Sequence, residues 1–243
     1  MKIPFLKILR YLLHVLLPRT CAHCREDLRY PDDGPLCPAC RANLEPIPEL
    51  HCKKCGVPLD SGGEYCFNCR GHKGGVALDF AVSAFVFNPE LRTLIHEFKY
   101  RGRRGLAGPL GLELAKAYDR YPRLKPYNFA MPVPLFREKE KERGFNQSRL
   151  LAEVLGREKK LFMLEGAVER IRNTPSQTGL TKKERLENMN GAFKVTRPEL
   201  VKGRRVLIID DVATTLATVS ELAGRLKKAG AAGAAVFTLA REP

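Results

Sequence analysis

The stretch VLIIDDVATTLAT, residues 206–218, decides both the fold class and the candidate site of this 243-residue chain. Its first part, VLIID (206–210), is a short apolar run typical of a buried strand, and LATVSELAGRLKKAG (216–230) has helical periodicity and ends at Gly230. A buried strand that passes through a short loop into a helix is the unit from which parallel sheets are built. The stretch therefore predicts an α/β domain.

Strands and helices alternate on both sides of this stretch. We expect further strands at 78–87, 128–134 and 234–240, and further helices at 91–100, 106–121 and 145–156. Such alternation implies parallel pairing with right-handed crossovers. We therefore predict one α/β domain over residues 77–243, with a parallel sheet covered by helices on both faces.

Ligands of parallel sheets bind beyond the carboxyl ends of the strands, which directs attention to residues 210–218. Asp210 and Asp211 offer carboxylates that accept hydrogen bonds from vicinal hydroxyls. The residues that follow lead into a helix N-terminus, whose backbone N–H groups and dipole favour a phosphate; they are Ala213, Thr214, Thr215, Leu216, Ala217 and Thr218. Together they predict a ribose phosphate site. The alternative is a strand-end acid that simply caps the next helix.

All eight cysteines lie between positions 21 and 69 and form four C-x2-C pairs. The pairs are Cys21 and Cys24, Cys37 and Cys40, Cys52 and Cys55, and Cys66 and Cys69. Gaps of 12, 11 and 10 residues separate them, which is the spacing of zinc ribbons. Residues 21–71 are therefore predicted to hold two structural Zn2+ sites of four thiolates each. The alternative, a disulfide framework, is disfavoured because a C-x2-C turn suits a structural disulfide poorly.

Residues 1–20 are expected to form an amphipathic helix that packs on the body of the protein. The apolar residues at helical spacing are Phe5, Ile8, Leu9, Leu12, Leu13 and Leu16. The segment superficially resembles a signal peptide, but no small-residue cleavage site follows it, and a membrane-surface contact stays open. No apolar run reaches the roughly 18 residues that span a bilayer, and thiolate zinc ligands persist in a reducing compartment. A soluble, cytoplasmic protein is expected.

The net charge of +15 makes polyanions plausible partners, above all nucleic acid and phosphorylated metabolites. Residues 77–243 carry 31 Lys and Arg against 19 Asp and Glu, whereas residues 1–76 carry 11 against 8. One basic segment includes an aromatic residue, as single-stranded DNA binding requires, and its candidate residues are Lys99, Tyr100, Arg101, Arg103 and Arg104. The alternative is an ordinary basic surface beside a helix. The charge therefore favours phosphorylated ligands first and DNA second.

The stretch 206–218 resembles the 5-phosphoribosyl diphosphate (PRPP) motif of the type I phosphoribosyltransferases. More of the chain resembles one branch of that superfamily, the ComF family, which is associated with DNA uptake in competent bacteria. The matching segments are the four Cys pairs, FKYRGRRGLAGPLG (98–111), PVPLFREKEKERGFNQSRLLA (132–152) and RNTPSQTGLTKKERLENMNGAF (172–193). The resemblance implies a phosphoribosyltransferase-like sheet behind a double zinc ribbon.

The resemblance also implies roles for residues. Asp210 and Asp211 would hold the ribose hydroxyls, residues 213–218 the 5-phosphate, and Pro132 to Leu135 the pyrophosphate, with Mg2+. Residues 172–191 resemble a flexible loop that closes over substrates. Candidate donors to the diphosphate are Arg137, Arg143, Arg172 and Arg185, together with Asn146 and Gln147.

Leu216 stands where the family's motif has Gly. A Leu there would oppose a positive φ or fill part of the phosphate space, so Leu216→Gly is expected to tighten PRPP binding. The function expected by resemblance is PRPP binding with a role in DNA uptake and transformation, alongside uptake-machinery proteins. Phosphoribosyl transfer stays undecided. The alternative is a catalytically degenerate, single-stranded-DNA-binding competence factor.

Overall fold

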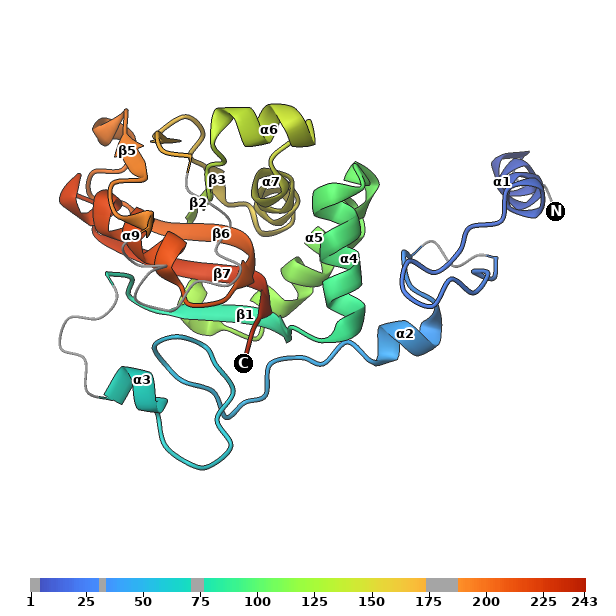
Figure 1. The fold of residues 1–243 in the computed structure, drawn as a ribbon, viewed down its shortest axis with the longest axis horizontal. Helices are drawn as coiled ribbons and strands as arrows, with labels where there is room; N and C mark the ends of the chain where they lie inside the picture. Colours follow the sequence, from blue (N-terminus) through green and yellow to red (C-terminus); the bar gives the residue numbers. More distant parts are fainter. Residues whose placement is uncertain (1–4, 31–33, 71–76, 174–187) are drawn as a thin grey trace.

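The computed structural model describes residues 5–30, 34–70, 77–173 and 188–243. A five-stranded sheet, in which every neighbouring pair is parallel, has the order β1-β7-β6-β2-β3. The strands are β1 (Ala81–Val86), β2 (Phe129–Pro132), β3 (Phe162–Met163), β6 (Arg205–Ala213) and β7 (Gly233–Arg241). Figure 1 shows this sheet with helices stacked on it. The predicted parallel α/β architecture is confirmed.

Helices cover both faces of the sheet because successive strand residues point to opposite faces. In β6, Leu207 and Ile209 join one apolar core, and Val206 and Ile208 join the other. The first core is covered by α4 (Pro89–Tyr100), α5 (Ala107–Tyr118) and α7 (Gln147–Lys159). The second is covered by α9 (Ala217–Lys228). Short 3-10 turns lie at Arg104–Leu106, Pro122–Leu124 and Pro198–Leu200.

Two differences from the predicted elements concern the ligand side of the sheet. The strand expected to stop at Asp210 continues to Ala213, so the acidic pair lies within β6. A small antiparallel sheet, β4 (Val168–Arg170) with β5 (Phe193–Val195), was not predicted. Its strands are too short for a periodic pattern to show. The charged segment at Arg137–Arg143 forms helix α6, as a solvated alternating-charge helix should.

The cysteine region forms two compact units. The first spans Cys21–Cys40 and includes helix α2 (Pro38–Ala42), and the second spans Cys52–Cys69 and includes helix α3 (Phe67–Arg70). Cys21 and Cys40 of the first unit join the core under α4, whereas Cys52 and Cys55 of the second join the core under α9. The first unit packs on α4, where Arg25 pairs with Glu97 (3.3 Å), whereas the second packs beside β1, where Ala81 N donates to Lys54 O (2.9 Å). The segment that connects them runs antiparallel along β1, where Ile47 N donates to Ala84 O (3.2 Å) and Val86 N donates to Glu45 O (2.8 Å).

Helix α1 (Phe5–Leu16) forms as predicted but does not pack on the body of the protein. It projects beyond the first cysteine unit (Figure 1) and contacts it through Tyr11, whose ring lies edge-on to Tyr30 at 5.5 Å. Leu12, Leu13 and Leu16 are exposed. The expected packing on the body was therefore wrong. Among the described residues, no helix combines the length and apolarity needed to cross a bilayer.

Candidate functional site

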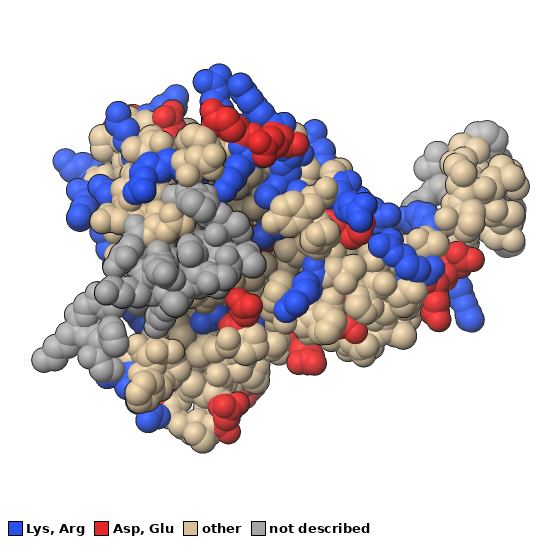
Figure 2. Space-filling model, in the orientation of Figure 1, with Lys and Arg blue, Asp and Glu red and all other residues tan. Residues whose placement is uncertain are grey.

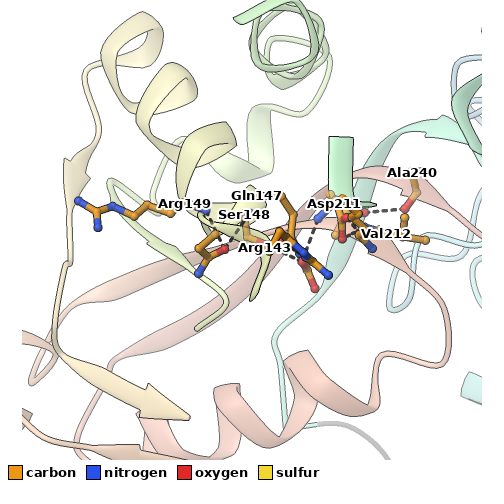
Figure 3. Close-up of polar contacts among 11 residues, drawn as sticks. Arg143, Gln147, Ser148, Arg149, Asp211, Val212 and Ala240 are labelled. Atoms are coloured by element: carbon orange, nitrogen blue, oxygen red, sulfur yellow. Dashed lines mark hydrogen bonds and ion pairs between the residues drawn. The ribbon is translucent and has the colours of Figure 1, made fainter. Parts of the chain in front are cut away.

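The acidic pair is held in place by hydrogen bonds from α7 and from its own strand. Ser148 Oγ donates to Asp210 Oδ1 (2.7 Å), which also accepts from the backbone N of Asp211 (2.9 Å). Asp211 Oδ1 accepts from the backbone N of Val212 (2.9 Å). Ser148 reaches the strand because Asn146 caps α7, accepting from the backbone N of Ser148 (3.0 Å). Figure 3 shows Ser148 and Asp211 within one cluster of polar contacts.

Lys99 neutralises one of the two acids. Its ammonium lies 2.6 Å from Asp211 Oδ2, and the Asp211 side chain is only 4% exposed. Burial lowers the pKa of Lys99, but the charges of Asp211 and Asp210 outweigh it and the net shift is upward. Burial, followed by the charge of Asp211, raises the pKa of Asp210 from 3.8 to about 7. Asp210 therefore titrates near neutral pH, whereas Lys99 keeps its charge beside Asp211.

The loop between β6 and α9 is short, because Ala213 still belongs to the strand and Ala217 and Thr218 already belong to the helix. Leu216 is the N-cap of α9 and has a left-handed backbone, with φ 62° and ψ 9°. This position therefore has the conformation that Gly adopts most easily. The Leu216 side chain, however, is buried in the core under α9. The expectation that it fills phosphate space was wrong.

Replacing Leu216 by glycine is expected to lower stability. The change relieves about 1 kcal/mol of left-handed strain but removes a buried leucine side chain, which costs about 2–5 kcal/mol. The net loss of about 1–4 kcal/mol corresponds to a Tm about 2–16 °C lower in thermal denaturation. Lys160→Gly is the matched control, since Lys160 is also left-handed (φ 55°) but exposed, and its Tm should not fall. An unchanged Tm in Leu216→Gly would mean that the side chain contributes nothing to the core.

A pocket of about 450 Å³ opens at the carboxyl end of β2. Its walls include Pro132, Pro134 and Leu135, the segment expected to bind pyrophosphate, and the predicted donors Arg137 and Asn146. Arg149 also lines it, but pairs with Glu153 (2.9 Å) and Glu165 (3.2 Å) and points away from the acidic pair in Figure 3. The wall is therefore of mixed charge.

Arg170 connects the pocket to the acidic pair. It lies at the end of β4, lines the pocket, and places its guanidinium 5.8 Å from the centre of the Phe193 ring. Burial lowers the pKa of Arg170, and the charge of Asp210 opposes that shift. The small β4–β5 sheet thus carries a cation that lines the pocket and whose charge interacts with that of Asp210, which sequence reasoning did not identify.

Two other predicted diphosphate donors, Arg143 and Arg172, do not line the pocket. Arg143 donates to Gln147 and places its guanidinium 5.3 Å from the centre of the Tyr100 ring. Arg172 donates to the backbone O of Asn190. Arg185, with most of the expected flexible loop at 172–191, lies outside the described residues.

The five residues of the basic segment expected to bind DNA do not form one exposed surface. Lys99 turns inward to Asp211 and is not part of an exposed patch. Tyr100 is 65% exposed, and Arg101 is exposed beside it. Arg103 pairs with Glu97 (3.2 Å), and Arg104 lies 5.3 Å from the centre of the Phe145 ring. The Lys and Arg side chains visible in Figure 2 are interspersed with acidic ones.

The eight cysteines form two four-thiol groups, as predicted. Within each group the sulfur atoms all lie within 4.8 Å of one another, and the groups comprise Cys21, Cys24, Cys37 and Cys40, and Cys52, Cys55, Cys66 and Cys69. Cys24 and Cys37 sulfurs are 3.7 Å apart, and those of Cys55 and Cys66 are 3.6 Å apart. A tetrahedral site with Zn–S bonds of about 2.3 Å needs sulfurs about 3.8 Å apart, so both groups fit Zn2+.

Sequence reasoning missed Ser148 and the inward role of Lys99 at this site. A weak signal existed for Ser148, because Asn146 is a good helix N-cap and places the following residues in the first turn. Lys99 offered no such signal, since it meets Asp211 only through the packing of α4 against the sheet.

A double zinc ribbon joined to a parallel α/β domain, with an acidic pair near the carboxyl end of β6, defines the class of this protein. A family model described as "Double zinc ribbon domain" matches residues 12–70. "Competence protein F" of Haemophilus influenzae is 34% identical, over 91% of this chain and 96% of its own. "DNA utilization protein YhgH" of Escherichia coli is 33% identical (93% and 98%), and "Competence protein ComFC" of Bacillus subtilis 29% (86% and 85%). The chain belongs to this competence protein F family.

Proposed function

We propose that this protein binds PRPP, or a related ribose phosphate, at Asp210, Asp211 and residues 213–218, and acts in DNA uptake. The role in DNA uptake is supported by the competence and DNA utilization proteins to which the chain is similar. The observation that best supports ligand binding is the acidic pair, which Ser148 and Lys99 hold beside the loop that enters α9.

The chemistry of the site suits a ribose phosphate. The carboxylates of Asp210 and Asp211 accept hydrogen bonds from vicinal hydroxyls. Because burial raises the pKa of Asp210 to about 7, its protonated form is present near neutral pH and can also donate. The loop at Thr214–Leu216 directs the N-terminus of α9 toward a phosphate. Because Lys99 already neutralises Asp211, the pair repels an anionic ligand less than two free carboxylates would.

The pocket at β2 is the proposed place of the diphosphate. Arg137 and Arg170 supply guanidinium donors to it, and Mg2+, when bound with the ligand, would neutralise further charge. Phosphoribosyl transfer would break the bond from ribose C1 to the diphosphate oxygen and form one from C1 to a nucleophile. In this proposal the acidic pair holds the ribose and the pocket at β2 holds the leaving group for such a step.

A second candidate function is binding of single-stranded DNA, and the observation that favours it is Tyr100. Its ring is 65% exposed, and Arg143 lies 5.3 Å from the ring centre. An exposed aromatic flanked by a guanidinium stacks bases while contacting phosphate. The eight free thiols suit the reducing cytoplasm, which is where we place both functions.

Calorimetric titration with PRPP and Mg2+ tests the first proposal. We expect binding by the wild-type chain and a loss of at least tenfold in affinity in Asp211→Ala, because a hydrogen bond to a charged group contributes about 1.5–3 kcal/mol. Release of diphosphate that is lost in Asp211→Ala would show turnover as well. Lack of binding by the wild-type chain would contradict the proposal.

A separate titration with a single-stranded oligonucleotide tests the second candidate. Affinity should fall with salt at a log-log slope of about −0.7 per phosphate contact, and Tyr100→Ala should weaken it. Arg157→Ala is the control, since Arg157 is an exposed basic residue on α7. A flat salt dependence would remove Tyr100 and its neighbours from the DNA interface.

A further inference from the structure

Arg241, the last residue of β7, is a buried arginine that no part of the proposed ligand chemistry uses. Its side chain crosses from the α/β domain to the second cysteine unit. Nε donates to the backbone O of Cys55 (3.1 Å), while Nη1 donates to the backbone O of Ala213 (2.9 Å) and of Thr214 (2.6 Å). A single guanidinium therefore joins a predicted zinc ligand to the start of the loop that enters α9.

Both ends of this connection are fixed. The Cys52–Gly56 turn is docked on the sheet, since Lys54 Nζ donates to Leu78 O (2.6 Å) and Ala81 N donates to Lys54 O (2.9 Å). A Cβ on Gly56 would lie 2.8 Å from Ala81 O, so the approach is as close as a glycine allows. At the other end, Glu242 N donates to Ala213 O (2.9 Å).

The orientation of the Cys55 carbonyl depends on the turn that presents the Cys55 thiol. Gly56 N donates to Cys52 O (2.9 Å) and Cys52 N donates to Val57 O (2.8 Å), so the same six residues, 52–57, hold both the thiols and the carbonyl. These residues, together with Cys66 and Cys69, fit one Zn2+. Loss of that ion would release the turn, because a zinc ribbon of this size depends on its metal for folding.

We propose that Arg241 is a positioning residue through which the second zinc site sets the conformation of the Ala213–Leu216 loop. With the metal bound, the Cys55 carbonyl holds the guanidinium, and the guanidinium holds the two loop carbonyls. Without it, Arg241 loses one of its anchors and the loop gains freedom. Among the described residues, the first zinc site has no hydrogen bond to Arg241 or to this loop, and its unit packs on α4 instead. The ligand side of this inference rests on the proposed function.

Hydrogen–deuterium exchange of the loop tests the coupling in the full chain without any ligand. In Cys66→Ser, which should lose the second zinc, we expect exchange at 213–218 to accelerate at least about tenfold. Cys24→Ser, the matched variant at the first site, should leave this exchange unchanged. Metal analysis of each variant confirms which zinc is lost. Unchanged exchange at 213–218 in a Cys66→Ser chain that holds one zinc would overturn the proposal.

Arg241→Lys tests the same connection while both zinc sites stay loaded. Lysine keeps the charge but lacks the planar fork that reaches the Cys55 carbonyl and the two loop carbonyls at once, so loop exchange should rise as in Cys66→Ser. Arg120→Lys is the control, because Arg120 donates to a strand carbonyl, Ala84 O (2.6 Å), on the other face of the sheet. Equal loop exchange in the two lysine variants would overturn the proposal.

PRPP affinity in these variants separates this inference from the function on which it rests. If the wild-type chain binds PRPP, Cys66→Ser and Arg241→Lys should each weaken binding about tenfold or more, and Cys24→Ser and Arg120→Lys should not. If the wild-type chain does not bind PRPP, the proposed function fails, while the exchange measurements still decide whether the second zinc site controls the loop.

Discussion

Lys99→Met is expected to destabilise the protein by about 3–5 kcal/mol, because it leaves the Asp211 carboxylate buried beside Asp210 without its cation. Methionine has nearly the length of lysine, so packing of α4 should change little. In a chain of this size the loss corresponds to a Tm about 6–20 °C lower in thermal denaturation. This is one of the two largest effects we expect from a single change.

A double-mutant cycle separates the charge from the packing. Asp211→Asn removes the stranded charge, so the Lys99→Met/Asp211→Asn chain should be more stable than Lys99→Met alone. Lys116→Met is the matched control, since Lys116 pairs with Glu113 at 2.7 Å on an exposed helix face and should shift the Tm hardly at all. A Lys99→Met chain with a wild-type Tm would refute the buried ion pair.

Removal of metal is expected to have the other large effect. Metal analysis of the purified protein should return two Zn2+ per chain, and each site should contribute on the order of 10 kcal/mol to folding of its unit. The cysteine units hold few large apolar side chains, so the metal supplies most of their folding free energy. After chelation, limited proteolysis should cut within residues 21–70 before it cuts the sheet.

The controls for chelation use the metal itself. Adding Zn2+ back should restore protection, whereas Mg2+ should not, because four thiolates are unsuitable ligands for that hard cation. Fewer than two Zn2+ per chain, or a chelated chain that resists proteolysis as well as the untreated one, would contradict two structural zinc sites.

The sequence predicted those features that depend on neighbouring residues. Cysteine spacing identified both four-thiol groups because each C-x2-C turn brings its own pair of sulfurs together. Apolar runs identified β6 and β7 because buried parallel strands lack polar alternation. The motif marked position 216 as one that favours glycine, but Leu216 adopts the positive φ that a leucine was expected to oppose.

Features that depend on packing between distant segments were not predictable. Lys99 looked like part of a DNA-binding surface because nothing near it in sequence reveals that α4 points its last turn at Asp211. Arg170 and Arg241 reach their partners only through sheet geometry. Helix α1 was expected to be covered, since amphipathicity reports that an apolar face exists and does not report what lies against it.

The segment that connects the two cysteine units, residues 41–51, covers part of an exposed sheet edge. β1 is an outer strand of the sheet, and an outer strand with free N–H and C=O groups pairs readily with other chains. Residues Glu45–Ile47 occupy part of that edge by hydrogen bonding to Ala84 and Val86. The zinc units on either side hold this segment in place. Loss of the metal would loosen this segment, so we expect zinc-depleted protein to expose the β1 edge and to aggregate more readily than the loaded protein.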